Sequence, residues 1–238
     1  MIFITGETVK NYLSEFAGTF GFVFIGCGAV VFAAPFIGYL GIAMAFGLAY
    51  SAMGFAFKGH HFNPAVTIAA ALSGQFRGKN IWFTLIKTAG YVLLQTAGAC
   101  AAVFLIYYVY SGKTGYVYQG SPDANVIDRY ALPAAFCLET ILSFLFLCVF
   151  LGNNDHTDRQ AAACGSFITA ACLLSYPVTK GALNPARTTA SALFGGETAL
   201  AQLPVFWAAA LTAALAAGIV YHPFFRRGKK QKAEVNAS

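Results

Sequence analysis

The tripeptide Asn-Pro-Ala occurs twice in this chain, and an arginine directly follows the second copy. The copies are Asn63-Pro64-Ala65 and Asn184-Pro185-Ala186, and the arginine is Arg187. Asn is a preferred N-cap whose side-chain oxygen accepts a backbone N–H, and Pro is favoured at the first helical position. Each copy therefore predicts a helix start with an NH2 group beside it. These amides and the guanidinium are donors that can orient a small neutral molecule and repel a cation.

Each Asn-Pro-Ala tripeptide, called a box below, begins a short segment. The sequence of that segment predicts half of a membrane-spanning helix. The following residues permit a helix, and each segment reaches a glycine, Gly74 or Gly195, where a helix commonly stops. A helix of about 12 residues is roughly 18 Å long, a little over half of a ~30 Å hydrocarbon core. Two ordinary loop-to-helix caps are the simpler interpretation. Two matched copies favour half-helices that build a pore or a site at mid-membrane.

The composition excludes an ordinary soluble domain, because 58% of the residues are hydrophobic and only 10% are charged. Six stretches are long enough to cross a bilayer as helices and are interrupted only by Glu15 and Glu139. They are Tyr12–Ala34, Gly38–Phe57, Thr88–Tyr110, Tyr130–Asn154, Gln160–Thr179 and Thr198–Phe225. The predicted fold is an all-α membrane protein with six transmembrane helices and two re-entrant half-helices.

The order of these elements is the same in both halves of the chain. We expect one domain over residues 1–238, with repeats at about 12–110 and 130–225 and a basic tail at 226–238. Each repeat holds span, span, half-helix and span, so an odd number of crossings inverts the second repeat relative to the first. Inverted repeats with broken helices at the midplane are an architecture of transport proteins.

Glu15 and Glu139 lie at similar positions in the first span of each repeat. An isolated carboxylate inside a membrane is costly, so each one needs partners or a functional reason. In the structural interpretation, each Glu accepts N–H groups from the irregular backbone that leads into its half-helix. A proton-carrying role is the alternative. The structural interpretation is favoured because the spans hold few other ionisable residues that could act with them.

The net charge of +6 does not indicate nucleic acid binding, because its densest cluster follows the last span. That cluster is Arg226, Arg227, Lys229, Lys230 and Lys232, which predicts a cytoplasmic anchor on anionic lipid. We expect the protein to lie in the cell membrane, which is the inner membrane in a Gram-negative cell. With an even number of six spans, both termini are then on the cytoplasmic side. All six cysteines fall within predicted spans, so no disulfide framework is expected. The N-terminus has no cleavable-signal pattern.

With its twin boxes, the arginine and the paired glutamates, the chain resembles the aquaporin (major intrinsic protein) family, and its bacterial water channels most. The resemblance runs from about Leu13 to Tyr221 and includes the string His-Phe-Asn-Pro-Ala-Val-Thr-Ile that begins at His61. It implies a passive, proton-excluding water channel in the bilayer, with no enzymatic activity, cofactor or metal. It also implies a homotetramer in which each subunit has its own pore.

The resemblance places a selectivity filter at Phe46, Cys172, Gly181 and Arg187. It also gives His61 a place in the supporting loop. Where water-selective relatives carry a His and a Thr or Cys, this chain carries Cys172 and Gly181, which are smaller or less polar. We therefore expect a wider filter that leaks small neutral solutes such as ammonia and hydrogen peroxide. The alternative placements are Arg187 at the outer lipid interface and Phe46 facing the lipid or the core.

Other functions stay open on the sequence. The alternative within the family is a facilitator of glycerol, urea or ammonia, although Thr188, Ala192 and Phe206 resemble the water-channel set. An ion-coupled transporter lacks charged partners here, and an enzyme lacks a catalytic constellation within the spans. The adjacent His60 and His61 could be a metal site, but no Cys, Asp or Glu lies nearby in sequence. With Lys58, they could instead form a pH-sensitive inner mouth.

Overall fold

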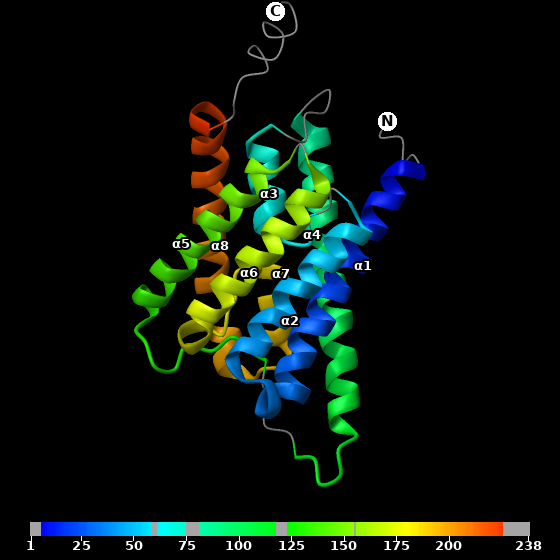
Figure 1. Ribbon diagram of the computed structural model, residues 1–238, viewed down its shortest axis with the longest axis vertical. Helices are drawn as coiled ribbons and strands as arrows, with labels where there is room; N and C mark the ends of the chain where they lie inside the picture. Colours follow the sequence, from blue (N-terminus) through cyan, green and yellow to red (C-terminus); the bar gives the residue numbers. More distant parts are fainter. Residues whose placement is uncertain (1–5, 59–60, 75–80, 118–122, 155, 226–238) are drawn as a thin grey trace, which may run out of the picture.

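The computed structural model describes residues 6–58, 61–74, 81–117, 123–154 and 156–225, and all of its regular elements in this part are helices (Figure 1). In chain order they are α1 (Gly6–Gly28), the π-helix η1 (Ala29–Ala33), α2 (Ala34–Ala56), α3 (Pro64–Leu72), α4 (Ile81–Ser111), α5 (Leu132–Gly152), α6 (Thr157–Thr179), α7 (Pro185–Leu193) and α8 (Glu197–Phe225). His60, Arg77, Lys79 and the basic tail at 226–238 lie outside the described residues.

Five helical stretches of the described chain are long and apolar enough to cross a membrane. The first runs from Glu7 to Ala56 and is too long for one crossing, since 50 residues of straight helix would extend about 75 Å. Within it Gly38 has φ 57° and ψ −168°, which breaks the helix. The chain turns back there, and α1 and α2 lie side by side (Figure 1). The described part thus has six spanning helices, as the sequence predicts.

The helix contacts follow the predicted twofold repeat. Helix α1 packs along α4 in the first half, and α5 packs along α8 in the second. The half-helix α3 contacts α8, and α7 contacts α4, so each half-helix packs against the last helix of the other half. Helices α2 and α6 join the two halves directly. The start of α1 and the end of α8 lie at the same end of the bundle (Figure 1).

Small residues allow the two halves to meet closely. A Cβ atom added to Gly47 of α2 would lie 2.4 Å from the Gly165 carbonyl oxygen, and a Cβ on Gly165 would lie 2.4 Å from the Gly47 carbonyl oxygen. Only glycine fits at this crossing. Such contacts between small residues hold helices together in lipid, where burial of apolar surface gives little driving force.

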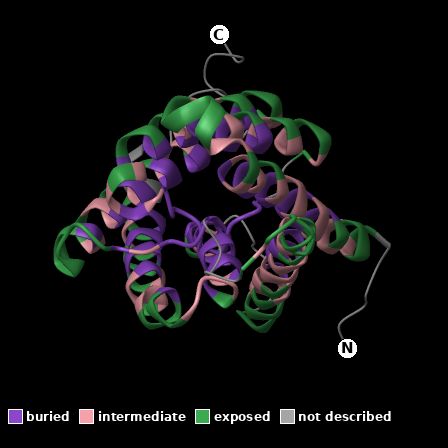
Figure 2. Cartoon of the chain, turned by 90° about the horizontal axis from the view of Figure 1, so that it is seen from below, coloured by how far each residue is buried: buried purple, intermediate pink, exposed green. Residues whose placement is uncertain are grey.

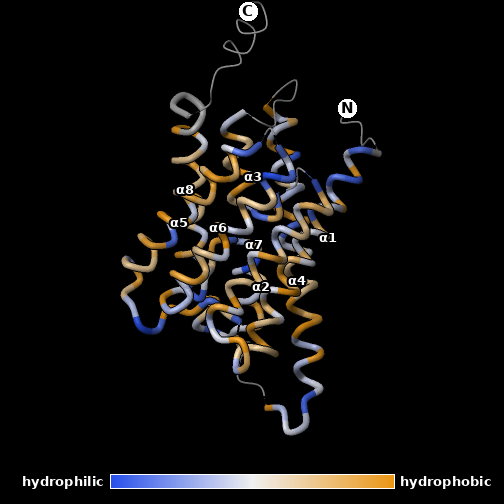
Figure 3. Tube along the Cα trace, viewed as in Figure 1, coloured by the Kyte–Doolittle hydropathy of each residue, from blue (hydrophilic) through white to orange (hydrophobic). Residues whose placement is uncertain are grey.

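Burial and hydropathy divide the bundle into an inside and an outside. Buried residues face the middle, where the half-helices lie, and exposed residues cover the periphery (Figure 2). The long helices are mostly hydrophobic along their length (Figure 3). Many large apolar side chains, among them Phe36, Leu93 and Ile219, are exposed on the surface. A bundle with this apolar outer surface is suited to lie in a bilayer.

The half-helices are shorter than the sequence suggests. Each has nine residues, and the helical residues end at Leu72 and Leu193. Gly74 follows α3 with φ 78°, in the left-handed region where glycine is favoured. Gly195 holds the equivalent place after α7, two residues beyond the last helical residue, but the glycine with a left-handed backbone there is Gly196 (φ 87°). Gly195 instead packs tightly, since its Cβ would meet Ala124 at 2.5 Å.

Candidate functional site

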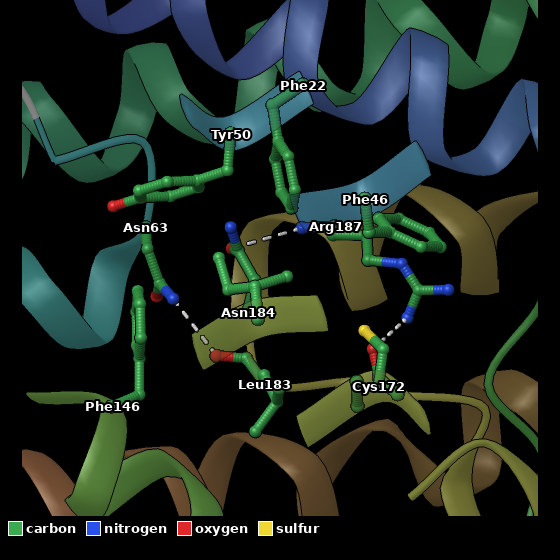
Figure 4. A pocket seen from close by; sticks show the side chains of 12 residues that line it. Phe22, Phe46, Tyr50, Asn63, Phe146, Cys172, Leu183, Asn184 and Arg187 are labelled. Atoms are coloured by element: carbon green, nitrogen blue, oxygen red, sulfur yellow. Dashed lines mark hydrogen bonds between the residues drawn. The ribbon is translucent and has the colours of Figure 1, made fainter. Parts of the chain in front are cut away.

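The two asparagines of the boxes cap their half-helices and bond across to the other half. Asn63 Oδ1 accepts from Ala65 N at 2.9 Å, and Asn184 Oδ1 accepts from Ala186 N at 3.0 Å. Asn63 Nδ2 donates to Leu183 O at 3.0 Å (Figure 4), and Asn184 Nδ2 donates to Phe62 O at 2.8 Å. Because each NH2 group carries two hydrogens, each amide keeps one more donor for a guest molecule.

The residue before each asparagine adopts a backbone conformation that is rare for a side chain. Phe62 has φ 54° and Leu183 has φ 51°. This left-handed conformation costs of order 1–3 kcal/mol and persists only where the surroundings fix it. Here both sides of the residue are held, since its carbonyl accepts from the opposite asparagine and its N–H donates to a buried glutamate.

Glu15 and Glu139 are these glutamates, and both are buried. Glu15 accepts from His61 N at 2.8 Å, from Phe62 N at 2.9 Å and from Gln95 Nε2 at 2.7 Å. Glu139 accepts from Leu183 N at 2.9 Å and from the hydroxyl of Thr179. These contacts are those of the structural interpretation, in which each carboxylate fixes the loop that leads into its half-helix.

Arg187 is buried, with 1% of its surface exposed, and its guanidinium lies inside the bundle and not at the lipid interface. Its Nη1 donates to Asn125 Oδ1 at 2.7 Å and to Gly181 O at 3.0 Å. Nε and Nη2 are buried and have no hydrogen-bond partner in the described part of the chain. A guanidinium with spare donors in a buried site can bind the oxygen of a polar guest.

Phe46 faces this guanidinium, with its ring centroid 4.7 Å from Arg187 Cζ. The ring needs the glycine opposite, because a Cβ on Gly26 would lie 2.2 Å from Phe46 Cδ1. Cys172 and Gly181 lie together on another wall, where a Cβ on Gly181 would lie 2.9 Å from Cys172 Sγ. The structure thus brings the four residues of the expected filter to one place.

One cavity connects these four residues with the two asparagines (Figure 4). It offers about 10 Å³ to the centre of a water-sized sphere, which is room for about one water molecule. Three aromatic rings, those of Phe22, Tyr50 and Phe146, also line it. No motif in the sequence marks any of the three.

Two cationic side chains belong to the filter end of this cavity. Arg187 lies there, and Lys180 begins the loop that leads from α6 to the second box. Burial lowers the pKa of Lys180, and the negative charge of Asp128 opposes that effect. Asn125, from the loop between α4 and α5, reaches in to the guanidinium and to Thr179 O at 2.7 Å. Asn125 was not predicted, since nothing local in the sequence ties this loop to Arg187.

His61 lies in the network of hydrogen bonds around the loop before the first box. Its ring Nδ1 lies 3.0 Å from Thr67 Oγ1, and its carbonyl accepts from the hydroxyl of Tyr50 at 3.0 Å. Lys58 forms an exposed ion pair with Asp158, whose nearest N–O distance is 2.9 Å. Within the described residues, no three His, Cys, Asp or Glu side chains form a group that could hold a metal.

A membrane-spanning bundle with two half-helices that meet in its interior defines a channel-like membrane protein. The family model described as "Major intrinsic protein" matches residues 3–221. The chain is 37% identical over 228 residues to Aquaporin Z of Rhodopseudomonas palustris, covering 89% of this chain and 92% of the relative. It is also 37% identical over 229 residues to Aquaporin Z of Bradyrhizobium diazoefficiens, covering 90% and 92%. The chain therefore belongs to the major intrinsic protein family, as the resemblance predicts.

The fold is also similar to a solved structure. The X-ray structure of the aquaglyceroporin from Plasmodium falciparum superposes with a TM-score of 0.78 at 21% sequence identity, covering 97% of this chain and 100% of the other. At this identity the likeness concerns the fold alone. Family membership and the apolar helices make the protein an integral membrane channel for water or small solutes and not an enzyme.

Proposed function

We propose that the protein is a passive, proton-excluding water channel whose pore runs through each subunit between the filter and the two asparagines. The observation that carries the proposal is the pair of buried amides, each with one N–H free of the cross-bonds to Leu183 O and Phe62 O. A water molecule between them accepts from both asparagines. Its oxygen is held toward them, and its neighbours point their hydrogens in opposite directions.

Electrostatics support exclusion of cations, hydronium included. Each half-helix N-terminus carries partial positive charge, of order half an elementary charge, and both meet at this point. The Arg187 guanidinium adds a full charge at the filter. A cation therefore meets a barrier at two levels, whereas a neutral water exchanges its lost hydrogen bonds for those of the amides.

Small neutral solutes are the proposed secondary cargo. Cys172 and Gly181 leave the filter wall small and weakly polar, so ammonia and hydrogen peroxide are expected to pass with water. The alternative function is a facilitator whose main cargo is glycerol, urea or ammonia. For the assembly and its setting, the proposal is a homotetramer in the cell membrane, one channel domain per chain, with both termini in the cytoplasm.

The test is stopped-flow light scattering of proteoliposomes after a hyperosmotic glycerol shock. Fast shrinkage with slow re-swelling supports a water channel that excludes glycerol. Fast re-swelling would favour the facilitator, and shrinkage no faster than that of empty liposomes contradicts both. A flux that depends on an imposed ion gradient would instead indicate coupled transport.

A further inference from the structure

Three aromatic rings surround the cavity between the filter and the asparagines, and we name them the aromatic collar. The collar consists of Phe22 from α1, Tyr50 from α2 and Phe146 from α5. The ring centroids of Phe22 and Tyr50 lie 5.4 Å apart, and those of Tyr50 and Phe146 lie 5.8 Å apart. Phe22 and Tyr50 lie on the side of the cavity opposite Leu183 (Figure 4).

The inverted repeat explains why each half of the chain brings one phenylalanine to the cavity. Phe22 and Phe146 each follow the buried glutamate of their repeat, Glu15 or Glu139, by about two helical turns. Each glutamate fixes the loop before its own half-helix, so residues two turns later on the same helix face lie level with the lumen. The two halves thus bring a phenylalanine to the cavity from opposite helices.

The collar is held in place by its contacts. The Tyr50 hydroxyl donates to His61 O at 3.0 Å, and its ring packs edge-on against Phe22, Phe62 and Phe146. The Phe22 ring also contacts Phe46, with 5.9 Å between centroids. Packed rings in a dense interior do not swing aside without moving their neighbours. The collar is therefore a fixed wall.

The size of the cavity follows from the collar and not from the filter alone. Cys172 and Gly181 are small, yet the cavity still has only about 10 Å³ for the centre of a water-sized sphere. The phenyl rings offer no hydrogen-bonding group, so a guest finds no polar partner on their side of the cavity. A polyol or urea would meet a steric limit, and the hydroxyl or amide groups turned toward the rings would lose their hydrogen bonds to water.

We infer that Phe22 sets the size limit of the channel, so that its cargo is restricted to neutral molecules about as wide as water, with glycerol and urea stopped at the collar. This inference rests on the proposed water-channel function. It assigns size selection to a residue of α1, beyond the four residues of the filter. In this assignment the filter admits neutral molecules, and the collar limits their size.

The test compares Phe22→Leu with Phe20→Leu in proteoliposomes of the full chain. Phe20 is the matched control, because it lies in the same helix, is partly buried and stacks on Phe24 without lining the cavity. Sucrose shocks measure water permeability, and separate glycerol and urea shocks measure solute entry. We expect Phe22→Leu to raise glycerol and urea entry several-fold above the wild-type level. Phe20→Leu is expected to match the wild type in both measurements.

A second variant, Phe146→Leu, opens the collar from the other half of the chain. It replaces Phe22→Leu in the test if Phe22→Leu does not fold. Water conduction without increased glycerol or urea entry in every folded collar variant would overturn the inference and leave the proposed function standing. A wild type that conducts glycerol as fast as water would also overturn it. Wild-type water permeability equal to that of empty liposomes would contradict the proposed function itself, and the inference with it.

Discussion

The Arg187 guanidinium carbon lies 4.7 Å from the centre of the Phe46 ring, deep in the bundle. The negative face of an aromatic ring attracts a cation, so the contact stabilises the buried charge without using its hydrogen-bond donors. The donors that are used go to Asn125 and Gly181, and Nε and Nη2 stay unpartnered in the described part of the chain. Charge is thus held fixed while donors remain for a passing molecule.

Replacing Arg187 by alanine is expected to weaken cation exclusion. The substitution removes the fixed charge that lies closest to the cavity and leaves the two half-helix termini as the main barrier. We expect proton permeability to rise by on the order of tenfold, which corresponds to about 1.4 kcal/mol of barrier. Proteoliposomes with a pH-sensitive dye inside and a potassium diffusion potential measure the flux.

The matched control for this variant is Arg159→Ala, an exposed arginine near the start of α6. It is expected to leave proton permeability at the wild-type value. Equal proton flux in Arg187→Ala and the wild type would show that Arg187 does not contribute to the barrier.

The Cys172 thiol is expected to make the channel sensitive to mercurials. Cys172 lines the narrow cavity beside Gly181, so a mercury adduct on its Sγ would fill the space for water. We expect mercuric chloride to reduce water permeability of the wild type to near the level of empty liposomes, with recovery in excess thiol. Cys172→Ala is expected to resist inhibition.

Cys164 of the same helix provides the control. It is fully buried but does not line the cavity. Cys164→Ala is expected to stay sensitive to mercury. Inhibition that persists in Cys172→Ala and disappears in Cys164→Ala would place the reactive thiol elsewhere than the filter.

Gly181 cannot accept a side chain without cost, for two separate reasons. Its φ of +64° is in the left-handed region, and a Cβ would lie 2.9 Å from Cys172 Sγ. We expect Gly181→Ala to cost about 1–2 kcal/mol, or roughly 2–8 °C in melting temperature. Thermal unfolding in detergent gives the shift.

The double variant Gly181→Ala/Cys172→Ala separates the two causes. It relieves the contact with sulfur but not the backbone strain, so it should recover part of the loss and show a favourable coupling energy. Strictly additive losses would mean that the two positions do not share this wall.

Local chemistry made much of the fold predictable. The spans follow from length and lack of charge, and the caps follow from Asn at the N-cap and Pro after it. After α7 the two glycines Gly195 and Gly196 adjoin, and sequence alone does not tell which one takes the positive φ.

Long-range contacts were not predictable in the same way. The bonds from each asparagine to the carbonyl of the opposite half depend on how the repeats dock. Phe22 is one of the 23 phenylalanines of the chain and lies in a span of mostly apolar residues, so periodicity does not mark it. The one available signal was its spacing from Glu15, which matches that of Phe146 from Glu139.

Glu15→Gln is expected to destabilise the protein more than Glu139→Gln. Each oxygen of Glu15 accepts from a backbone N–H, which cannot turn into an acceptor, since His61 N donates to Oε1 and Phe62 N donates to Oε2. An amide NH2 in place of either oxygen would therefore face a donor. We expect a loss of about 2–3 kcal/mol.

Glu139 differs because one of its oxygens accepts from the Thr179 hydroxyl, which can rotate and accept from a glutamine NH2. Glu139→Gln should therefore cost less, and the control Glu7→Gln, at an exposed position in the first turn of α1, should cost almost nothing. Thermal unfolding of the three variants in one detergent measures the order. Equal losses for Glu15→Gln and Glu7→Gln would mean that the loop before the first box does not depend on its carboxylate.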